Sequence, residues 1–156
     1  MVIMATRGGT PSDNAPAAHW LLDRAPVLVV AEAALLQGTE VVGWPGATRT
    51  PLHPGGPAQW LTAGLTVDPA FRHRGIGHRL LQAVIEAVGA LHGDTLHSVM
   101  NARNAPSLAL HRSLGFTALE TGPCSPSIEF DGGVGVLLMR PKGSSASPRW
   151  VSTLRP

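Results

Sequence analysis

The sequence predicts an α+β fold built around one mixed, mostly antiparallel sheet that is flanked by helices. Several short apolar or β-branched runs, typical of strands, recur along the chain. Only two longer segments carry apolar residues at helical spacing, and the predicted order is strand, strand, strand, helix, strand, helix, strand, strand. This order is typical of one sheet with helices packed against it.

The length of 156 residues corresponds to one domain, which we expect to occupy residues 17–140. Residues 1–16 are rich in Gly, Pro and Ala, residues 141–156 are rich in Ser and Pro, and neither segment has a periodic apolar face. We therefore expect a flexible N-terminal arm and a flexible C-terminal tail.

Composition and charge exclude several classes of protein. No tract is apolar and long enough to span a bilayer, and the start of the chain lacks the basic and apolar regions of a secretion signal. Cys124 is the only cysteine and has no activating motif around it, so we expect a spectator thiol in a cytoplasmic protein. The net charge is only +2 and the arginines are scattered, so neither nucleic acid nor a membrane is an expected partner.

The N-terminal half is expected to contribute a short helical turn and three strands. A β-branched apolar run indicates a buried strand, and Pro and Gly residues mark the connections. The expected elements are a helical turn over 17–22, a strand over 27–31, a turn over 37–39, a returning strand over 40–44, a loop or very short edge over 45–57, and a longer strand over 59–67.

The C-terminal half is expected to contain both long helices. The first should cover 77–88, where apolar residues repeat at helical spacing, with Gly89 as its C-cap. Asn104 should open the second helix, with Pro106 just behind it, and Gly115 should end it. The expected strands are 95–100, 116–120 and 133–139, and the last is preceded by a short extended segment over 128–130 and a turn at Asp131-Gly132.

The turn before the first long helix has the character of an anion site. A helix N-terminus exposes unpaired N–H groups and the positive end of the helix dipole. Gly75 and Gly77 would let the backbone approach a ligand that a Cβ atom would hold away. Arg72, Arg74 and Arg79 add positive charge around the same turn.

Two other phosphate motifs do not fit this turn. Leu80 stands where a dinucleotide-binding fingerprint needs its third glycine, and the Gly-Lys-Ser/Thr of a Walker A loop is absent. The remaining alternative is a tight glycine turn whose arginines are merely solvated. The residues that flank the turn favour the anion site.

The turn resembles the central motif of GNAT acetyltransferases through the pattern Val67-x-Pro69-x-x-Arg72-x-x-Gly75-Ile76-Gly77-x-x-Leu80-Leu81. The resemblance implies a GNAT fold and acetyl-CoA as co-substrate, with the pyrophosphate wrapped by backbone amides of the turn. It also implies that the preceding strand pairs with the pantetheine arm as an extra strand would. The expected coenzyme-binding residues are Leu65, Thr66, Val67, Arg72, His73, Arg74, Gly75, Ile76, Gly77, His78 and Asn104.

The segment from Asn104 to Phe116 resembles the family's other signature, which is Asn, then a helix, then Gly-Phe. Its local sequence is closest to the phosphinothricin-acetyltransferase-like branch, which commonly carries histidine where other members carry tyrosine. The resemblance implies that His111 protonates the departing thiolate, and a histidine is chemically suited to that role. The alternative is that His111 is a packed helix residue hydrogen-bonded to backbone.

The sequence does not identify a general base. Family members often carry Glu on the strand before the pyrophosphate turn, but the strand over 59–67 has no carboxylate. Glu32, His53, His97 and a chain of waters all stay open as alternatives. No metal is expected, because the histidines that lie near one another have no carboxylate or thiol at ligand spacing.

The expected function is acetyl transfer from acetyl-CoA to the primary amine of a small, amino-acid-like molecule by direct attack on the thioester. The alternatives are acetylation of protein N-termini or aminoacyl-tRNA, and a non-catalytic acyl-CoA-binding module. GNAT domains normally begin with a strand and two helices, whose connecting loop roofs the acceptor pocket, whereas few residues precede the predicted strand at Val27. A shortened N-terminal part would fit an open acceptor groove or a groove completed in a homodimer.

Overall fold

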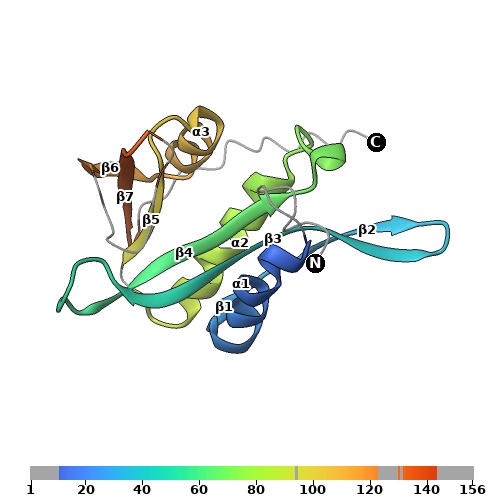
Figure 1. Ribbon diagram of the computed structural model, residues 1–156, viewed down its shortest axis with the longest axis horizontal. Coiled ribbons are helices and arrows are strands. Elements are labelled where there is room, and N and C mark those ends of the chain that lie inside the picture. Colours follow the sequence, from blue (N-terminus) through green and yellow to red (C-terminus); the bar gives the residue numbers. More distant parts are fainter. Residues whose placement is uncertain (1–10, 94, 123–129, 131, 144–156) are drawn as a thin grey trace, which may run out of the picture.

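The computed structural model describes residues 11–93, 95–122, 130 and 132–143, which form one mixed sheet with helices on both faces (Figure 1). The elements are α1 (Pro11–Arg24), β1 (Val27–Leu28), β2 (Ala31–Leu35), β3 (Gly38–Pro51), β4 (Ala58–Val67), the 3-10 helix η2 (Pro69–Phe71), α2 (Ile76–Ala90), β5 (Thr95–Asn101), α3 (Ala105–Ser113), β6 (Thr117–Gly122) and β7 (Gly135–Pro141). The strand order is β1-β3-β4-β5-β7-β6, and β2 pairs with β3. Among these strands only β4 and β5 are parallel, so the predicted α+β class and mostly antiparallel sheet are confirmed.

Helix α1 begins earlier than the sequence predicts. The expected helical turn started at residue 17, but the helix starts at Pro11, so residues 11–16 do not belong to an unstructured arm. Proline is common in the first turn of a helix, where its missing N–H would have no partner. Near the C-terminal end of the helix, the Leu21 side chain packs against Trp44 and so attaches α1 to the sheet. Residues 1–10 and 144–156 lie outside the described residues, and the mobility of both ends stays a prediction.

The Pro- and Gly-rich segment after Trp44 is a strand, and the prediction of a loop or short edge there was wrong for residues 45–51. Strand β3 runs through it to Pro51 and pairs with both β1 and β4. Pro45 is tolerated because it faces an irregularity in β4, where no backbone donor is needed, while its carbonyl accepts from Val29 N–H at 2.9 Å. The expected strand over 27–31 is accordingly split between β1 and β2.

Strand β4 contains a bulge at Gly64. The pairing steps by two residues on β3, from Trp44 to Gly46, while it steps by three on β4, from Thr66 to Ala63. Gly64 has a positive φ of 71°, and a Cβ atom there would lie 2.5 Å from the Trp44 ring. Glycine is therefore needed for both the backbone conformation and the close approach of the indole.

The two parallel strands β4 and β5 meet only at one end. The register pairs are Trp60 with Leu96 and Leu61 with His97, and beyond them the strands diverge toward α2 and α3 (Figure 1). We call this opening between β4 and β5 the fork. No register pair joins β4 to β5 beyond Leu61, so this edge of β4 is left without a strand partner on the β5 side.

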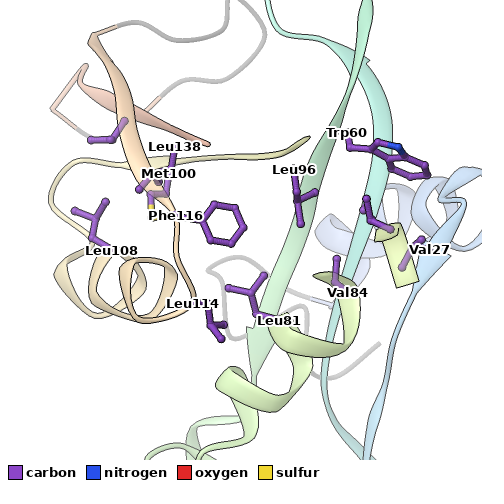
Figure 2. Packing of buried hydrophobic residues seen from close by; sticks show 13 residues of the cluster. Val27, Trp60, Leu81, Val84, Leu96, Met100, Leu108, Leu114, Phe116 and Leu138 are labelled. Atoms are coloured by element: carbon purple, nitrogen blue, oxygen red, sulfur yellow. The ribbon is translucent and has the colours of Figure 1, made fainter. Parts of the chain in front are cut away.

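The main core lies between the sheet and helices α2 and α3 (Figure 2). Leu81 and Val84 of α2 have no exposed surface and pack against Trp60 and Leu96 of the fork strands. Side chains alternate along a strand, so Leu96 and Ser98 face α2 and α3 whereas His97 faces the opposite side of the sheet. Helix α1 covers part of that opposite side.

Both long helices are confirmed, with one corrected end. Helix α2 runs through Gly89 to Ala90, and Gly93 N–H closes its last turn by donating to Val88 O at 2.9 Å. Helix α3 begins after Asn104, whose side chain accepts from Ser107 N–H at 3.2 Å, and Gly115 follows its end with a φ of 87°. The expected segment over 128–130 and the turn at Asp131 lie largely outside the described residues, as does Cys124. Within the described ranges no helix has the length and hydrophobicity to cross a bilayer.

Candidate functional site

A cavity of about 610 Å³ opens where the end of β4, the turn before α2 and the start of α3 come together. It is lined by Leu65, Thr66, Val67, Phe71, Arg72, His73, Gly75, Ile76, Gly77, Asn104, Pro106, Ser107 and Leu110. The structure therefore brings together all the expected coenzyme-binding residues except Arg74 and His78, although they come from three separate elements. We call it the coenzyme cavity, after the ligand that the sequence leads us to expect there.

The glycine turn presents free backbone donors to this cavity. Gly75 is the N-cap of α2 with a left-handed φ of 75°, and no side chain caps the helix. The first helical bond joins Arg79 N–H to Gly75 O at 3.1 Å, so the N–H groups of the first turn have no intrahelical acceptor. A Cβ atom at Gly75 would meet no protein atom within 4 Å, so the space beside it is open to a ligand.

The cations around the turn have different roles. Arg72 lines the cavity, and its Nε donates to Val67 O at 3.0 Å, which ties the turn to the end of β4. The Arg74 guanidinium instead lies over the Phe71 ring at 5.2 Å from its centroid, where a cation is attracted to the aromatic face. Arg79 lines a separate cavity on the β2 side of α2. Positive charge therefore enters the coenzyme cavity mainly through Arg72 and the helix end.

Sequence reasoning missed Phe71, Pro106, Ser107 and Leu110 as lining residues. Ser107 and Leu110 are three residues apart on α3, so they share the face that Asn104 introduces. The helical spacing after Asn104 was the available signal for them. Phe71 had no such signal, because its position depends on the 3-10 turn that Asp68 caps by accepting from Ala70 N–H at 2.8 Å.

His111 is not among the residues that line the coenzyme cavity. The residue is only 2% exposed and lies edge-on to Phe116, with 5.0 Å between ring centroids. Its Nδ1 is 2.8 Å from Ser107 O, and its Nε2 is 3.0 Å from Ser98 Oγ. Both ring nitrogens are thus engaged inside the protein, behind the wall formed by α3.

The partners of His111 determine its tautomer. A carbonyl can only accept, so Nδ1 carries the proton and donates to Ser107 O. Nε2 then accepts from the Ser98 hydroxyl, which in turn accepts from Thr62 Oγ1 at 2.7 Å. Burial lowers the pKa of His111, which keeps the ring neutral. This arrangement agrees with the alternative of a packed helix residue hydrogen-bonded to backbone, and the role of acid stays a prediction.

The candidate bases occupy different places. Glu32 is exposed on β2, and the His53 side chain is 61% exposed in the loop before β4, with its Nε2 3.9 Å from Glu120 Oε2. His97 is only 6% exposed and lies on β5 at the closed end of the fork. Within the residues that the structure describes, no three metal-ligating side chains gather in one place.

Comparisons with known proteins agree with the expected family and fold. Residues 5–116 match the model of the acetyltransferase (GNAT) family. Over 79 residues the chain is 34% identical to the N-alpha-acetyltransferase RimI of Mycobacterium tuberculosis, covering 51% of this chain and 47% of that protein. Over 52 residues it is 40% identical to the ribosomal protein bS18-alanine N-acetyltransferase of Salmonella typhimurium, covering 33% of this chain and 35% of that one. The matches thus span less than half the length of these curated relatives.

A solved structure described as a candidate phosphinothricin N-acetyltransferase has a TM-score of 0.65 and 26% identity, with 88% of this chain and 84% of that chain covered. Other similar solved structures are described with different activities. One of them is a ribosomal-protein-alanine N-acetyltransferase from Brucella melitensis. The expected placement nearest to the phosphinothricin-like branch is therefore one similarity among several.

Proposed function

Because the chain belongs to the acetyltransferase (GNAT) family, we propose that it moves an acetyl group from acetyl-CoA to a primary amine. The observation that carries the proposal is the coenzyme cavity, which joins an uncapped helix N-terminus to the unpaired edge of β4. The uncapped N–H groups and Arg72 suit the pyrophosphate. The free edge of β4 suits the amide groups of a pantetheine arm.

A pantetheine arm that pairs with the edge of β4 would extend from the turn toward the closed end of the fork. From Val67 back to Leu61 the strand covers roughly 20 Å at the usual rise per residue. A ligand that is held at the turn and extends along this edge therefore brings its far end toward the closed end of the fork. The acetyl thioester is proposed to lie there.

The acceptor that we propose is the α-amino group at the start of a peptide. This choice rests on the two curated relatives, whose names specify N-alpha and ribosomal-protein-alanine acetylation. A small amino-acid-like acceptor, as expected from the sequence, is the second candidate, and the structural neighbour at 26% identity favours it. A cytoplasmic location and a homodimer also stay predictions.

A set of matched amines separates these acceptors. A peptide that begins with alanine, the same peptide with a blocked N-terminus, and free alanine are each mixed with acetyl-CoA, and thiol release is followed. We expect release only with the free peptide. Turnover of free alanine or other small amines without the peptide would favour the small-molecule acceptor. Tight acetyl-CoA binding without thiol release from any amine would support the non-catalytic module.

Gly75 and Gly89 provide a matched test of the coenzyme turn. Acetyl-CoA at 100 times its Kd is expected to stabilise the wild type by about 2.7 kcal/mol. Gly75→Ala should lower the free energy of unfolding by about 1–2 kcal/mol, because alanine is strained at a φ of 75°. It should also abolish most of the acetyl-CoA stabilisation, because the new Cβ atom enters the ligand space. The measurement is thermal unfolding with and without acetyl-CoA.

Gly89→Ala is the control for this test. Gly89 lies in the same helix with equally open surroundings but without a positive φ. Alanine there should raise stability by about 0.5–1 kcal/mol and leave the acetyl-CoA effect unchanged. Equal acetyl-CoA stabilisation of both variants would show that the turn is not the binding site.

A further inference from the structure

A second cavity, of about 340 Å³, lies at the closed end of the fork. Its lining comes from the loop between β3 and β4 and from neighbouring positions of β4, β5 and β7: Leu52, His53, Gly56, Pro57, Gln59, Thr95, His97 and Met139. Thr95 and His97 alternate with Leu96, which belongs to the core beneath α2. The cavity therefore opens on the sheet face opposite to α2 and α3.

From this placement we propose that His97 is the general base that removes a proton from the acceptor amine. The inference rests on the proposed function and names a residue for a step that the sequence left open. Leu61 and His97 form the last register pair before the strands separate. His97 is thus a titratable side chain at the closed end of the fork, and it lines the second cavity.

One ring nitrogen of His97 is fixed and the other is available. Nδ1 lies 3.3 Å from Trp60 O, and since a carbonyl only accepts, Nδ1 carries the proton. Nε2 then holds the lone pair, and it has no hydrogen-bond partner among the described residues. Among the described residues, no fully buried side-chain nitrogen or oxygen lacks a hydrogen-bond partner. Because Nε2 has no such partner, it cannot be fully buried and must be in contact with solvent. The strand backbone therefore orients a base toward the second cavity.

The electrostatic surroundings keep this base neutral. Burial lowers the pKa of His97, and the backbone hydrogen bond to Trp60 only partly opposes that effect. Among the described residues, His53 lines the second cavity together with His97, and its exposed side chain lies 3.9 Å from Glu120 Oε2. No carboxylate among the described residues is paired with the His97 ring, so nothing there holds it in the charged form.

The two cavities lie on opposite faces of the sheet. The coenzyme cavity is lined from the side of α2 and α3, and the second cavity is lined on the other face by residues at the closed end of the fork, His97 among them. In this proposal the second cavity receives the amine while the coenzyme occupies its own cavity. His97 Nε2 lies on the side from which that amine arrives.

The proton balance needs no other residue. The ammonium form of the acceptor gives one proton to Nε2, and the freed lone pair attacks the carbonyl carbon. The carbon–sulfur bond breaks as the amide forms, and the second amine proton passes to the departing thiolate, which leaves as a thiol. The imidazolium then returns its proton to solvent through the second cavity.

His97→Asn tests the proposal, because asparagine retains a donor for Trp60 O but has no basic nitrogen. With the alanine-initiated peptide as acceptor, we expect kcat to fall about 10²–10⁴-fold while acetyl-CoA affinity stays the same. The wild-type kcat should be constant above pH 6.5 and fall only as the pH drops toward the His97 pKa, which lies below that value. The kcat of His97→Asn should not level off above pH 6.5. It should keep increasing with pH until the α-amine of the peptide loses its proton without a base, at about pH 8.

His92→Asn is the matched control. His92 is exposed in the turn before β5 with a φ of 58°, a conformation that asparagine tolerates. Its turnover and pH profile should equal those of the wild type. A His97→Asn variant that folds, binds acetyl-CoA and retains the wild-type rate and pH profile would overturn the proposal.

Nitrogen NMR of the histidine ring gives a test that is independent of the acceptor. We expect a neutral His97 at pH 7 with the proton on Nδ1 and a pKa below 6.5. A proton on Nε2, or a charged ring at pH 7, would overturn the assignment even if no amine is turned over. If no amine releases thiol although the ring is neutral and protonated on Nδ1, the proposed function itself fails and the non-catalytic module is supported. The ring state and thiol release thus distinguish failure of the base assignment from failure of the proposed function.

Discussion

Gly64→Ala is expected to lower the free energy of unfolding by about 2–5 kcal/mol, as the sum of backbone strain and overpacking. The residue has a φ of 71°, and a Cβ atom would lie 2.5 Å from two carbon atoms of the Trp44 ring. The indole cannot move away freely, because Trp44 packs against Leu21 of α1. Denaturant unfolding measures the change.

Two further variants separate strain from overpacking at Gly64. Gly55 has a φ of 75°, but a Cβ atom there would meet no atom within 4 Å, so Gly55→Ala should cost only the strain of about 1–2 kcal/mol. Trp44→Leu should reduce the additional cost of Gly64→Ala when the two are combined. If Gly64→Ala and Gly55→Ala cost the same, the contact with Trp44 does not constrain the bulge.

His111→Phe is expected to lower the free energy of unfolding by about 1–3 kcal/mol, because it leaves the buried Ser98 hydroxyl without its acceptor. Phenylalanine keeps the contact with Phe116 but accepts no hydrogen bond. Acetyl-CoA binding should be retained, since His111 does not line the coenzyme cavity. Turnover should also change far less than in His97→Asn, in contrast to the role of acid expected from the sequence.

The same residue makes stability depend on pH. The pKa of His111 is lower in the folded protein than the 6.5 of an unperturbed histidine, so the unfolded chain binds more protons below pH 6.5. Its contribution to stability is therefore complete above pH 6.5 and is lost as the pH falls toward the folded pKa. The free energy of unfolding should fall by up to about 1.4 kcal/mol per pH unit through this group. His111→Phe should remove the contribution of His111 to this pH dependence.

Ser98→Ala completes a double-mutant cycle with His111→Phe. If the bond between Ser98 Oγ and His111 Nε2 stabilises the fold, the double variant should cost less than the sum of the two single variants. Additive costs within about 0.3–0.5 kcal/mol would mean that the bond contributes nothing measurable.

The coenzyme turn could be predicted from sequence because its signals are local. Gly75, Gly77 and Arg72 stand at fixed spacings in one segment, and the structure places all three at the cavity. Asn104 was predicted for the same reason, since a helix cap depends on neighbours three residues away.

The remaining features depend on contacts between distant segments. Pro45 indicates a loop by itself, and only the bulge of β4 opposite to it makes a strand possible. The burial of His111 follows from Ser98 and Phe116, which belong to other segments of the chain. The sequence offers His97 only as one of several candidate bases, and its place at the vertex of the fork follows from the register with Leu61 on another strand. No periodicity within a single segment contains this information.

The short junction between β4 and β5 divides the sheet into two panels that share one seam. One panel is β1 to β4, and the other is β5 to β7 with α3. Backbone pairing across the seam is limited to two residue pairs. The hydrogen bond from Thr62 Oγ1 to Ser98 Oγ and the core beneath α2, which contains residues of both panels, also join them. The separation of β4 and β5 beyond the seam is thus set by side-chain contacts rather than by a backbone ladder, while each panel keeps its own internal pairing.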